Sequence, residues 1–227
     1  MRKSAFRPAD VAATVEYVKV QRHDEPRQAF WEGVHVHNRV HGVSWWQQVP
    51  QLSLDLIEAA ELGPADPIID VGAGWSTLID HLARRGHRDL TAVDLSATAL
   101  QAVRDRMGAA GSDVVLEVGD VLDLHPGRRF GLWHDRAVFH FLTERADRDA
   151  YRASLERSLG PPGWAVVATF GPQGPDTCSG LPVVRYTHAD LAAEFPGFEL
   201  VATSGEDHQT PWGSSQQFTA VLLRRQT

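Results

Sequence analysis

The protein has 227 residues, of which 43% are hydrophobic, and its 22 basic and 29 acidic residues give a formal net charge of −7. This length and composition predict one hydrophobic core with a modest extra segment rather than two full domains. The acidic balance and the scattered arginines disfavour the basic stripe that binds a phosphate backbone. Nucleic acid is therefore not an expected partner.

The sequence also indicates the compartment. It holds no run of about 18 apolar residues and no apolar segment of the kind found in secretory signals, which predicts a soluble, cytoplasmic protein without a membrane partner. Cys178 is the single cysteine, so an intramolecular disulfide is excluded and a reducing compartment fits. No pattern indicates the oligomeric state.

The N-terminal part of the chain predicts a helical layer. Aromatic residues and then a periodic apolar run occupy residues 30–62, and Pro50 can open a helix at its first turn. We therefore expect residues 1–64 to form a helical cap or lid, and residues 65–227 to form the main domain.

From residue 67 onward, short apolar runs alternate with helical patterns that end at glycine or proline. Strands are expected at 68–71, 90–93, 114–118, 132–134 and 164–170, and helices at 75–85, 96–109 and 146–159. Such alternation predicts parallel strands joined by crossover helices.

Beyond residue 170 the pattern predicts a loop, a short helix at 189–195 and two final strands, near 200 and at 218–223, joined by a loop. The fold class is therefore α/β. We expect a seven-stranded, mostly parallel, doubly wound sheet with an antiparallel closing hairpin and a helical N-terminal cap.

The segment Asp70-Val71-Gly72-Ala73-Gly74 joins the first of these strands to a helix. This arrangement lets backbone N–H groups approach a nucleotide cofactor, and Gly72 and Gly74 leave room for that approach. Taken alone, a Gly-x-Gly pair also fits an ordinary turn.

Two acidic residues and a threonine narrow the choice of cofactor. Asp94 ends the next strand, where its carboxylate can take both hydroxyls of a ribose; capping the following helix is the alternative. Asp70 would repel a pyrophosphate but favours an ammonium group, directly or through water. Thr77 stands where a dinucleotide fingerprint requires glycine, so NAD is disfavoured.

In these residues the sequence resembles the class I, Rossmann-like family of S-adenosylmethionine-dependent methyltransferases, whose first motif is acid-x-Gly-x-Gly-x-Gly and whose second is an acid ending the next strand. Ser76 stands in place of the third glycine. The likeness spans about residues 65–170 and includes the segments VGDV at 118–121, FGLWHDRAVFHFL at 130–142 and SLGPPGWAVVATF at 158–170.

The resemblance implies S-adenosylmethionine as the cofactor and S-adenosylhomocysteine as the product. In the family, an acid after the third strand contacts the adenine amino group, and the residue at the position of Asp135 lines the methionine part. The cofactor-binding residues that the resemblance implies are Asp70, Gly72, Ala73, Gly74, Asp94, Leu95, Asp120, Val121 and Asp135. For Asp120 a simple polar turn is the alternative.

A sulfonium methyl group is already electrophilic, so the protein has chiefly to align a nucleophile with it and exclude water. A histidine could remove a proton from the acceptor. We take His140 as the candidate base because it follows the fourth strand. Strand alternation turns His134 and Asp135 to opposite faces, so one of them reaches the cleft. Arg136, between them and His140, is expected on the substrate side.

Three tryptophans are candidates for the substrate wall. Trp45 and Trp46 belong to the N-terminal stretch that folds over the cleft in similar methyltransferases, although both could simply be core residues. Trp212 lies in the loop 207–213, which fits either a recognition surface or a packed hairpin tip.

The cluster HVHNRVH places His35, His37 and His41 at spacings that could hold a metal ion. No cysteine pair accompanies them and no acidic residue is interleaved, so we expect no metal site.

The leading hypothesis is methyl transfer to oxygen, nitrogen or sulfur of a small molecule in an aromatic pocket. A protein lysine acceptor, steered by the acidic charge, is the second hypothesis. An NAD-linked oxidoreductase and a cofactor-binding module without catalysis are the remaining alternatives.

Overall fold

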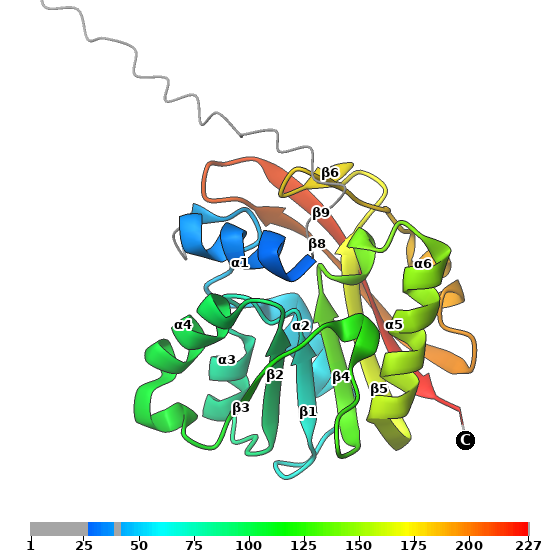
Figure 1. Ribbon diagram of the computed structural model, residues 1–227. Coiled ribbons are helices and arrows are strands. Elements are labelled where there is room, and N and C mark those ends of the chain that lie inside the picture. Colours follow the sequence, from blue (N-terminus) through cyan, green and yellow to red (C-terminus); the bar gives the residue numbers. More distant parts are fainter. Residues whose placement is uncertain (1–26, 39–41, 227) are drawn as a thin grey trace, which may run out of the picture.

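The computed structural model describes residues 27–38 and 42–226 (Figure 1). Its strands are β1 Ile68–Val71, β2 Leu90–Asp94, β3 Val115–Val118, β4 Phe130–Arg136, β5 Leu159–Phe170, β6 Thr177–Cys178, β7 Leu181–Pro182, β8 Phe198–Gln209 and β9 Ser215–Arg225. Its α-helices are α1 Arg27–His37, α2 Gln51–Glu58, α3 Leu78–Arg84, α4 Ala97–Met107, α5 Arg145–Ser158 and α6 His188–Ala193. Short 3-10 helices are η2 Gly108–Gly111, η3 Val121–Asp123 and η4 Phe139–Phe141.

Seven strands form one sheet in the order β3-β2-β1-β4-β5-β9-β8. The first five run parallel, whereas β9 is antiparallel to both β5 and β8. The predicted seven-stranded, mostly parallel sheet with an antiparallel closing hairpin is confirmed. Strand order reverses between β1 and β4, and this reversal is where open α/β sheets bind their ligands.

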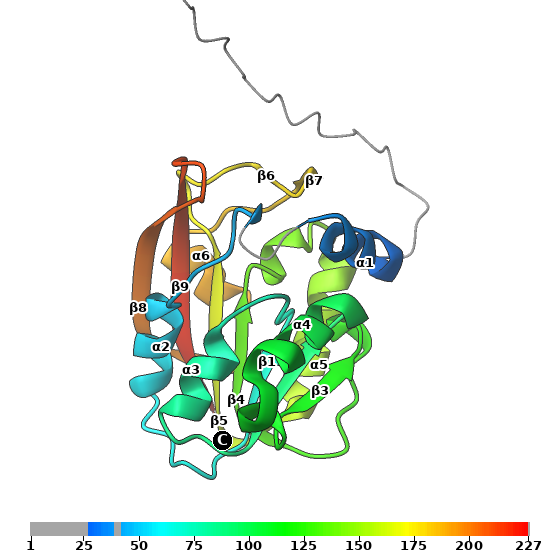
Figure 2. The same ribbon diagram turned by 90° about the vertical axis from the view of Figure 1, so that its left-hand side faces the viewer.

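Helices cover both faces of the sheet, and Figure 2 shows α2 and α3 on one side with α5 on the other. One apolar cluster joins Leu54 of α2 and Leu78 of α3 to Leu132 and Val166 of the sheet. A second cluster joins Tyr151 and Leu155 of α5 to alternate residues of the same strands. Because both faces are buried, these parallel strands consist of nearly continuous apolar runs.

Residues 1–64 were expected to form one helical cap, but helix α2 of this region packs in the main core. Leu52, Leu54, Leu56 and Ile57 place α2 in the main core, where the helix contacts β5, β8 and β9. Among the described residues that precede α2, α1 and residues 42–50 lie over the carboxyl ends of the strands (Figure 1). We therefore propose that the cap ends before α2 rather than at residue 64.

Several boundaries differ from those that the sequence predicts. Helix α3 begins at Leu78 rather than residue 75, because the Ser76 N–H donates to the Ala73 carbonyl and extends the turn. Strand β5 begins at Leu159 rather than residue 164 and includes the cis Pro161-Pro162 bond, at a shift of register against β4. Within the described residues, no helix is long and apolar enough to span a bilayer.

Candidate functional site

The glycine turn between β1 and α3 has the backbone that its sequence predicts. Gly72 and Gly74 have φ values of 61° and 49°, in the left-handed region that favours glycine. A Cβ on Gly72 would lie 2.0 Å from a methyl group of Val138, so any other residue there would clash. The Ala73 N–H donates to the Val93 carbonyl at 3.0 Å and ties the turn to β2.

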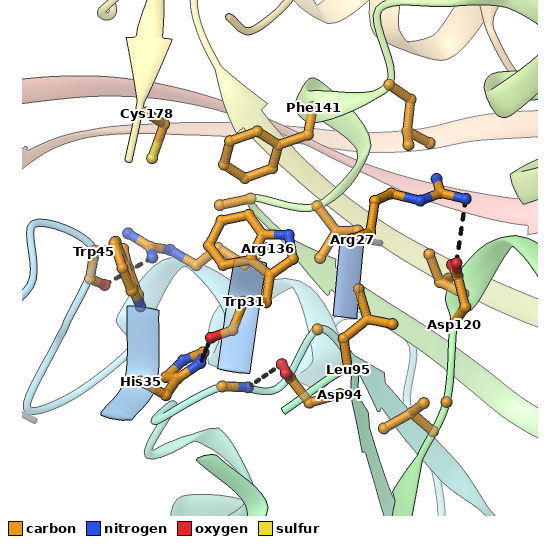
Figure 3. Close-up of a pocket in the computed structure, with 18 residues that line it drawn as sticks. Arg27, Trp31, His35, Trp45, Asp94, Leu95, Asp120, Arg136, Phe141 and Cys178 are labelled. Atoms are coloured by element: carbon orange, nitrogen blue, oxygen red, sulfur yellow. Dashed lines mark hydrogen bonds and ion pairs between the residues drawn. The ribbon is translucent and has the colours of Figure 1, made fainter. Parts of the chain in front are cut away.

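This turn is the floor of the main pocket, which opens at the carboxyl ends of β1 to β4 and is covered by α1 (Figure 3). The residues that line it are Arg27, Trp31, His35, Trp45, Gly72, Gly74, Val93, Asp94, Leu95, Gly119, Asp120, Val121, Arg136, Ala137, Val138, Phe141, Leu142 and Cys178. Six predicted cofactor-binding residues thus meet in one pocket: Gly72, Gly74, Asp94, Leu95, Asp120 and Val121.

Asp94 ends β2 on the pocket wall, and its carboxylate is held by two backbone donors. The Gly74 N–H donates to Oδ2 and the Ser96 N–H donates to Oδ1, both at 2.8 Å. Burial raises the pKa of Asp94, while these two N–H groups and the nearby His35 oppose that shift. Asp94 thus orients the glycine turn and also faces the pocket.

Asp120 and Val121 follow β3 on the next part of the wall. The Leu122 N–H donates to Asp120 Oδ1 at 2.9 Å, and Arg27 of α1 pairs with Asp120 Oδ2 at 3.2 Å. Figure 3 shows this pair at one end of the pocket. Asp120 therefore both caps the turn after β3 and contacts the covering helix.

Helix α1 supplies Arg27, Trp31 and His35 to the lining of this pocket. The sequence indicated His35 only as a possible metal ligand and did not indicate the other two. Glu32 fastens the helix, because its carboxylate accepts from the Ser96 hydroxyl at 2.6 Å and from Thr98. His35 is buried beside Trp75, and its Nδ1–H donates to the Trp31 carbonyl at 2.9 Å. The other ring nitrogen, Nε2, has no partner among the described residues.

A second chamber adjoins the main pocket on the other side of the glycine turn and shares Trp45, Gly72, Gly74 and Arg136 with it. Its remaining lining residues are Trp46, Gln47, Pro50, Ser53, Asp70, Ala73, Trp75, Ser76, Thr77 and His134. Of the three other predicted cofactor-binding residues, Asp70 and Ala73 line this chamber rather than the main pocket. His134 also faces it, whereas its neighbour Asp135 points to the opposite side of β4.

Arg136 stands between the two cavities with its charge compensated. Its guanidinium donates to the Trp45 carbonyl at 3.0 Å and to Glu206 at 3.1 Å, and lies 4.2 Å from the centre of the Phe218 ring. Burial lowers the pKa of Arg136, while the Glu206 carboxylate opposes that shift. Gln47 also donates to Glu206, at 2.9 Å.

Asp135, which the resemblance assigns to cofactor contact, lines neither cavity. Asp135 is fully buried behind the pocket wall, where it accepts from the Val138 and Phe139 N–H groups and from the Tyr151 hydroxyl at 2.6 Å. Burial raises its pKa to about 6. Its role is to hold the turn that presents Ala137 and Val138 to the pocket.

The candidate base His140 is likewise displaced from the wall. It is fully buried between Phe141 and Phe170, and its Nδ1 accepts from the Phe170 N–H. Burial, with the charge of Arg136 as a second cause, lowers the pKa of His140 to about 3. His140 lines neither cavity, so this geometry supports packing rather than proton removal.

The remaining candidates fall into two groups. Trp45 lines both cavities and Trp46 lines the second chamber, whereas Trp212 is 57% exposed at the tip of the β8–β9 hairpin, away from both. His37 is exposed and bonds to the Gly33 carbonyl, and His41 lies outside the described residues. In the part of the chain that the structure describes, no three potential metal ligands cluster.

Cys178 lines the main pocket and packs with Phe170 and Phe218. Burial raises the pKa of its thiol to about 11, so the thiol is neutral. Arg27, Trp31 and Phe141 were missed. For Trp31 and Phe141, the only signal in the sequence was the aromatic content of the first 64 residues and of the segment after β4. Arg27 had no such signal.

The fold and the pocket together indicate which kind of ligand the site can bind. A glycine turn lies where strand order reverses, and carboxylates follow at the ends of β2 and β3. This arrangement fits the adenosine part of a cofactor. The buried oxygen Asp70 Oδ2, without a partner among the described residues, adds an acceptor that fits an ammonium group and not a pyrophosphate. These residues fit a nucleoside cofactor that carries an amino acid.

Comparison with known proteins shows similarity to methyltransferases. Residues 68–163 match the methyltransferase domain family. The curated relative protein-L-isoaspartate O-methyltransferase from Methylorubrum populi is 33% identical over 128 residues, which are 56% of each chain. The chain thus spans about half the length of the curated relatives it matches first.

Two solved structures show the fold. An S-adenosylmethionine-dependent methyltransferase from Anabaena variabilis has a TM-score of 0.67 at 17% identity, with coverage of 88% of this chain and 93% of that one. The 1,6-didemethyltoxoflavin-N1-methyltransferase of Burkholderia thailandensis, solved with S-adenosylhomocysteine, has a TM-score of 0.62 at 22% identity, with 78% of each chain covered. The chain therefore has the fold of these two structures, and its residues 68–163 match a methyltransferase domain.

Proposed function

We propose that this protein transfers a methyl group from S-adenosylmethionine to oxygen, nitrogen or sulfur of a small-molecule acceptor. The observation that carries the proposal is that the main pocket continues from the glycine turn into an apolar end walled by Trp31, Trp45 and Phe141 under α1. When bound, the cofactor supplies a methyl group on positively charged sulfur, which is already electrophilic.

Each part of the main pocket has a proposed role in cofactor binding. Asp94 accepts from the ribose hydroxyls, and Asp120 and Val121 receive the adenine. Gly72 and Gly74 allow the close approach of the chain. His35 belongs with this set, because its unpartnered Nε2 lies 3.5 Å from the place of a Cβ on Gly74 and carries the lone pair when Nδ1–H donates to Trp31.

The apolar end favours a neutral, flat acceptor. Trp31 and Phe141 meet edge to face with ring centroids 5.0 Å apart, and Trp45 closes the same end. Arg136 is the charged residue at this end, and Glu206 already neutralises it. An acceptor with an uncompensated charge would lose its hydration there without gaining a partner.

Rate acceleration in this proposal comes from alignment and the exclusion of water rather than from a dedicated base. The aromatic side chains hold the acceptor, and α1 covers the cleft. His140 does not enter this scheme, because it is neutral, buried and behind the wall. Toward the acceptor, Arg136 acts indirectly, by donating to the Trp45 carbonyl.

A protein acceptor is a second candidate because the Methylorubrum populi relative is named for methylation of protein L-isoaspartate. Such an acceptor must reach the methyl group from outside, whereas Trp31, Trp45 and Phe141 wall the apolar end of the pocket and α1 covers it. This covering favours the small molecule.

Two measurements test the proposal. Calorimetry of the purified protein should show binding of S-adenosylmethionine and S-adenosylhomocysteine, and binding of NAD alone would refute it. A screen with methyl-radiolabelled cofactor should then label neutral aromatic compounds. Label that enters only isoaspartyl or lysyl peptides would establish the protein acceptor instead.

A further inference from the structure

The second chamber contains a buried chain of hydrogen bonds that the proposed function does not use. His134 Nδ1 lies 2.6 Å from Asp70 Oδ1, and His134 Nε2 lies 2.8 Å from the Ser53 hydroxyl oxygen. At most 2% of each of these three residues is exposed. They come from α2, β1 and β4, so the fold brings them together from three separate elements.

The carboxylate sets the direction of the first hydrogen bond. It has no proton to give, so His134 Nδ1–H donates to Asp70. When the ring is neutral, Nε2 has a lone pair and accepts from the Ser53 O–H. Without the Ser53 hydroxyl, Nε2 loses this partner and the ring is held at Nδ1 alone.

The oxygen that this chain leaves free is well placed for a ligand. Asp70 Oδ2 is buried on the wall of the second chamber and has no hydrogen-bond partner among the described residues. Two other residues that line this chamber each have a buried donor without a partner among the described residues, Trp75 Nε1 and Arg136 Nε. One acceptor and two donors match an ammonium and a carboxylate, the two ends of an amino-acid zwitterion.

We propose that Ser53 and His134 are positioning residues that hold Asp70 for the ammonium group of the cofactor's amino-acid part. The inference rests on the proposed function, since it takes the ligand to be S-adenosylmethionine or its product. Ser53 anchors the ring at Nε2, His134 holds Asp70 Oδ1, and Oδ2 is thereby left for the ligand. Asp70 makes the contact, and the other two act through it.

The test compares S-adenosylhomocysteine with 5′-methylthioadenosine, which has the nucleoside but lacks the amino acid. Calorimetry of Ser53→Ala should show roughly tenfold weaker binding of S-adenosylhomocysteine, because a hydrogen bond to a charged group is impaired. Binding of 5′-methylthioadenosine should be unchanged, which also shows that the variant is folded. Ser158→Ala, at a buried serine of α5 that bonds to the Ser154 carbonyl, is the matched control and should change neither affinity.

Coupling between the residues gives an independent readout. In an Asp70→Asn background, Ser53→Ala should cause no further loss, because the effect of the hydroxyl passes through the carboxylate. His134→Asn, which keeps a donor near the place of Nδ1, should retain more of the preference for S-adenosylhomocysteine than His134→Leu. If Ser53→Ala does not fold, the comparison of His134→Asn with His134→Leu tests the positioning role instead.

The outcomes separate the two proposals. Wild-type protein that binds neither nucleoside would refute the proposed function. Wild-type binding with equal losses of both ligands in Ser53→Ala, or with no loss of S-adenosylhomocysteine, would overturn the positioning role and leave the proposed function intact.

Discussion

Asp94 is the residue on which the proposed cofactor site depends most directly. Its carboxylate is held by the Gly74 and Ser96 N–H groups and faces the main pocket. In Asp94→Ala, S-adenosylhomocysteine should bind at least tenfold more weakly, because a charge-assisted contact worth about 1.5–3 kcal/mol is removed. Calorimetry measures this loss directly.

The matched control is Asp89→Ala, just before the other end of the same strand, where Asp89 pairs with Arg128 on the surface. This variant should bind S-adenosylhomocysteine like the wild type. Equal losses in the two variants would mean that Asp94 acts only through general stability, and an unchanged affinity in Asp94→Ala would remove its ribose role.

At the residue scale, the sequence predicts that the glycine turn and the acids that end strands lie close together, because parallel strands present their carboxyl ends at one edge of the sheet. The structure brings these residues together at that edge. His35 and Trp31 were not assigned to the pocket, because their contacts depend on where a helix about 40 residues earlier in the chain lies. Asp135 and His140 were misplaced because position in the chain does not show to which side a turn directs a side chain.

At the scale of elements, Glu32 is the attachment of α1 to the first turn of α4. Hydrogen bonds from Ser96 and then Thr98 lower the pKa of this carboxyl, so it stays ionised at neutral pH. In Glu32→Ala the amides of α1 should exchange with deuterium at least about tenfold faster, because hydrogen bonds to a charged group are lost. Mass spectrometry of the exchanged peptides tests this.

Glu58→Ala provides the control for that measurement. Glu58 is an exposed helix residue that pairs with Arg85 at 3.4 Å, and its loss should leave the exchange of α1 unchanged. If the α1 amides of Glu32→Ala exchanged at the wild-type rate, Glu32 would not be the attachment of this helix.

The end of β4 and the turn after it hold two buried groups whose effects on acid stability oppose each other. Burial lowers the His140 pKa from 6.5 to about 3, so the unfolded chain binds an extra proton between these values and stability falls as pH falls. Burial raises the Asp135 pKa from 3.8 to about 6, so the folded chain binds the extra proton there and stability rises as pH falls.

Replacing Asp135 should leave the destabilising effect of His140 at low pH without its opposing effect. In Asp135→Asn, the free energy of unfolding should fall between pH 6 and pH 4 by about 1.4 kcal/mol per pH unit more than in the wild type. Urea titrations at several pH values measure the slope. The exposed Asp105→Asn is the control, and a slope for Asp135→Asn equal to that of the wild type would contradict the raised pKa.

Element types were predicted well by periodicity, and their ends less well. The length of β5 was missed because Gly160 to Gly163 resembled a turn, whereas this segment is an irregularity within the strand, between Leu159, which pairs with Phe130, and Trp164, which pairs with Leu132. The hairpin β8–β9 extends further than expected because polar residues such as Asp207 alternate outward on a strand that pairs with β9 alone. Helix α2 was grouped with the cap because the sequence does not show which surface its apolar face covers.

At the scale of the whole molecule, ligand affinity and stability are coupled. The main pocket takes residues from α1, β2, β4 and the turn after β3, and the second chamber adds α2, so a cofactor there would contact both the cap and the sheet. A ligand that binds only the folded chain stabilises it by about 2.7 kcal/mol when present at 100 times its dissociation constant. For a chain of this size, that corresponds to a rise of roughly 5–10 °C in Tm.

Saturating S-adenosylhomocysteine should therefore raise Tm by this amount in scanning fluorimetry, and the rise should grow with the logarithm of ligand concentration. NAD should give no rise, because its pyrophosphate would meet Asp70 beside the glycine turn and the ribose carboxylate alone does not offset that repulsion. The two ligands share the adenosine that Asp94 and Asp120 face. A rise with NAD as large as that with S-adenosylhomocysteine would show that the pocket selects adenosine alone and that Asp70 contributes nothing to the choice of cofactor.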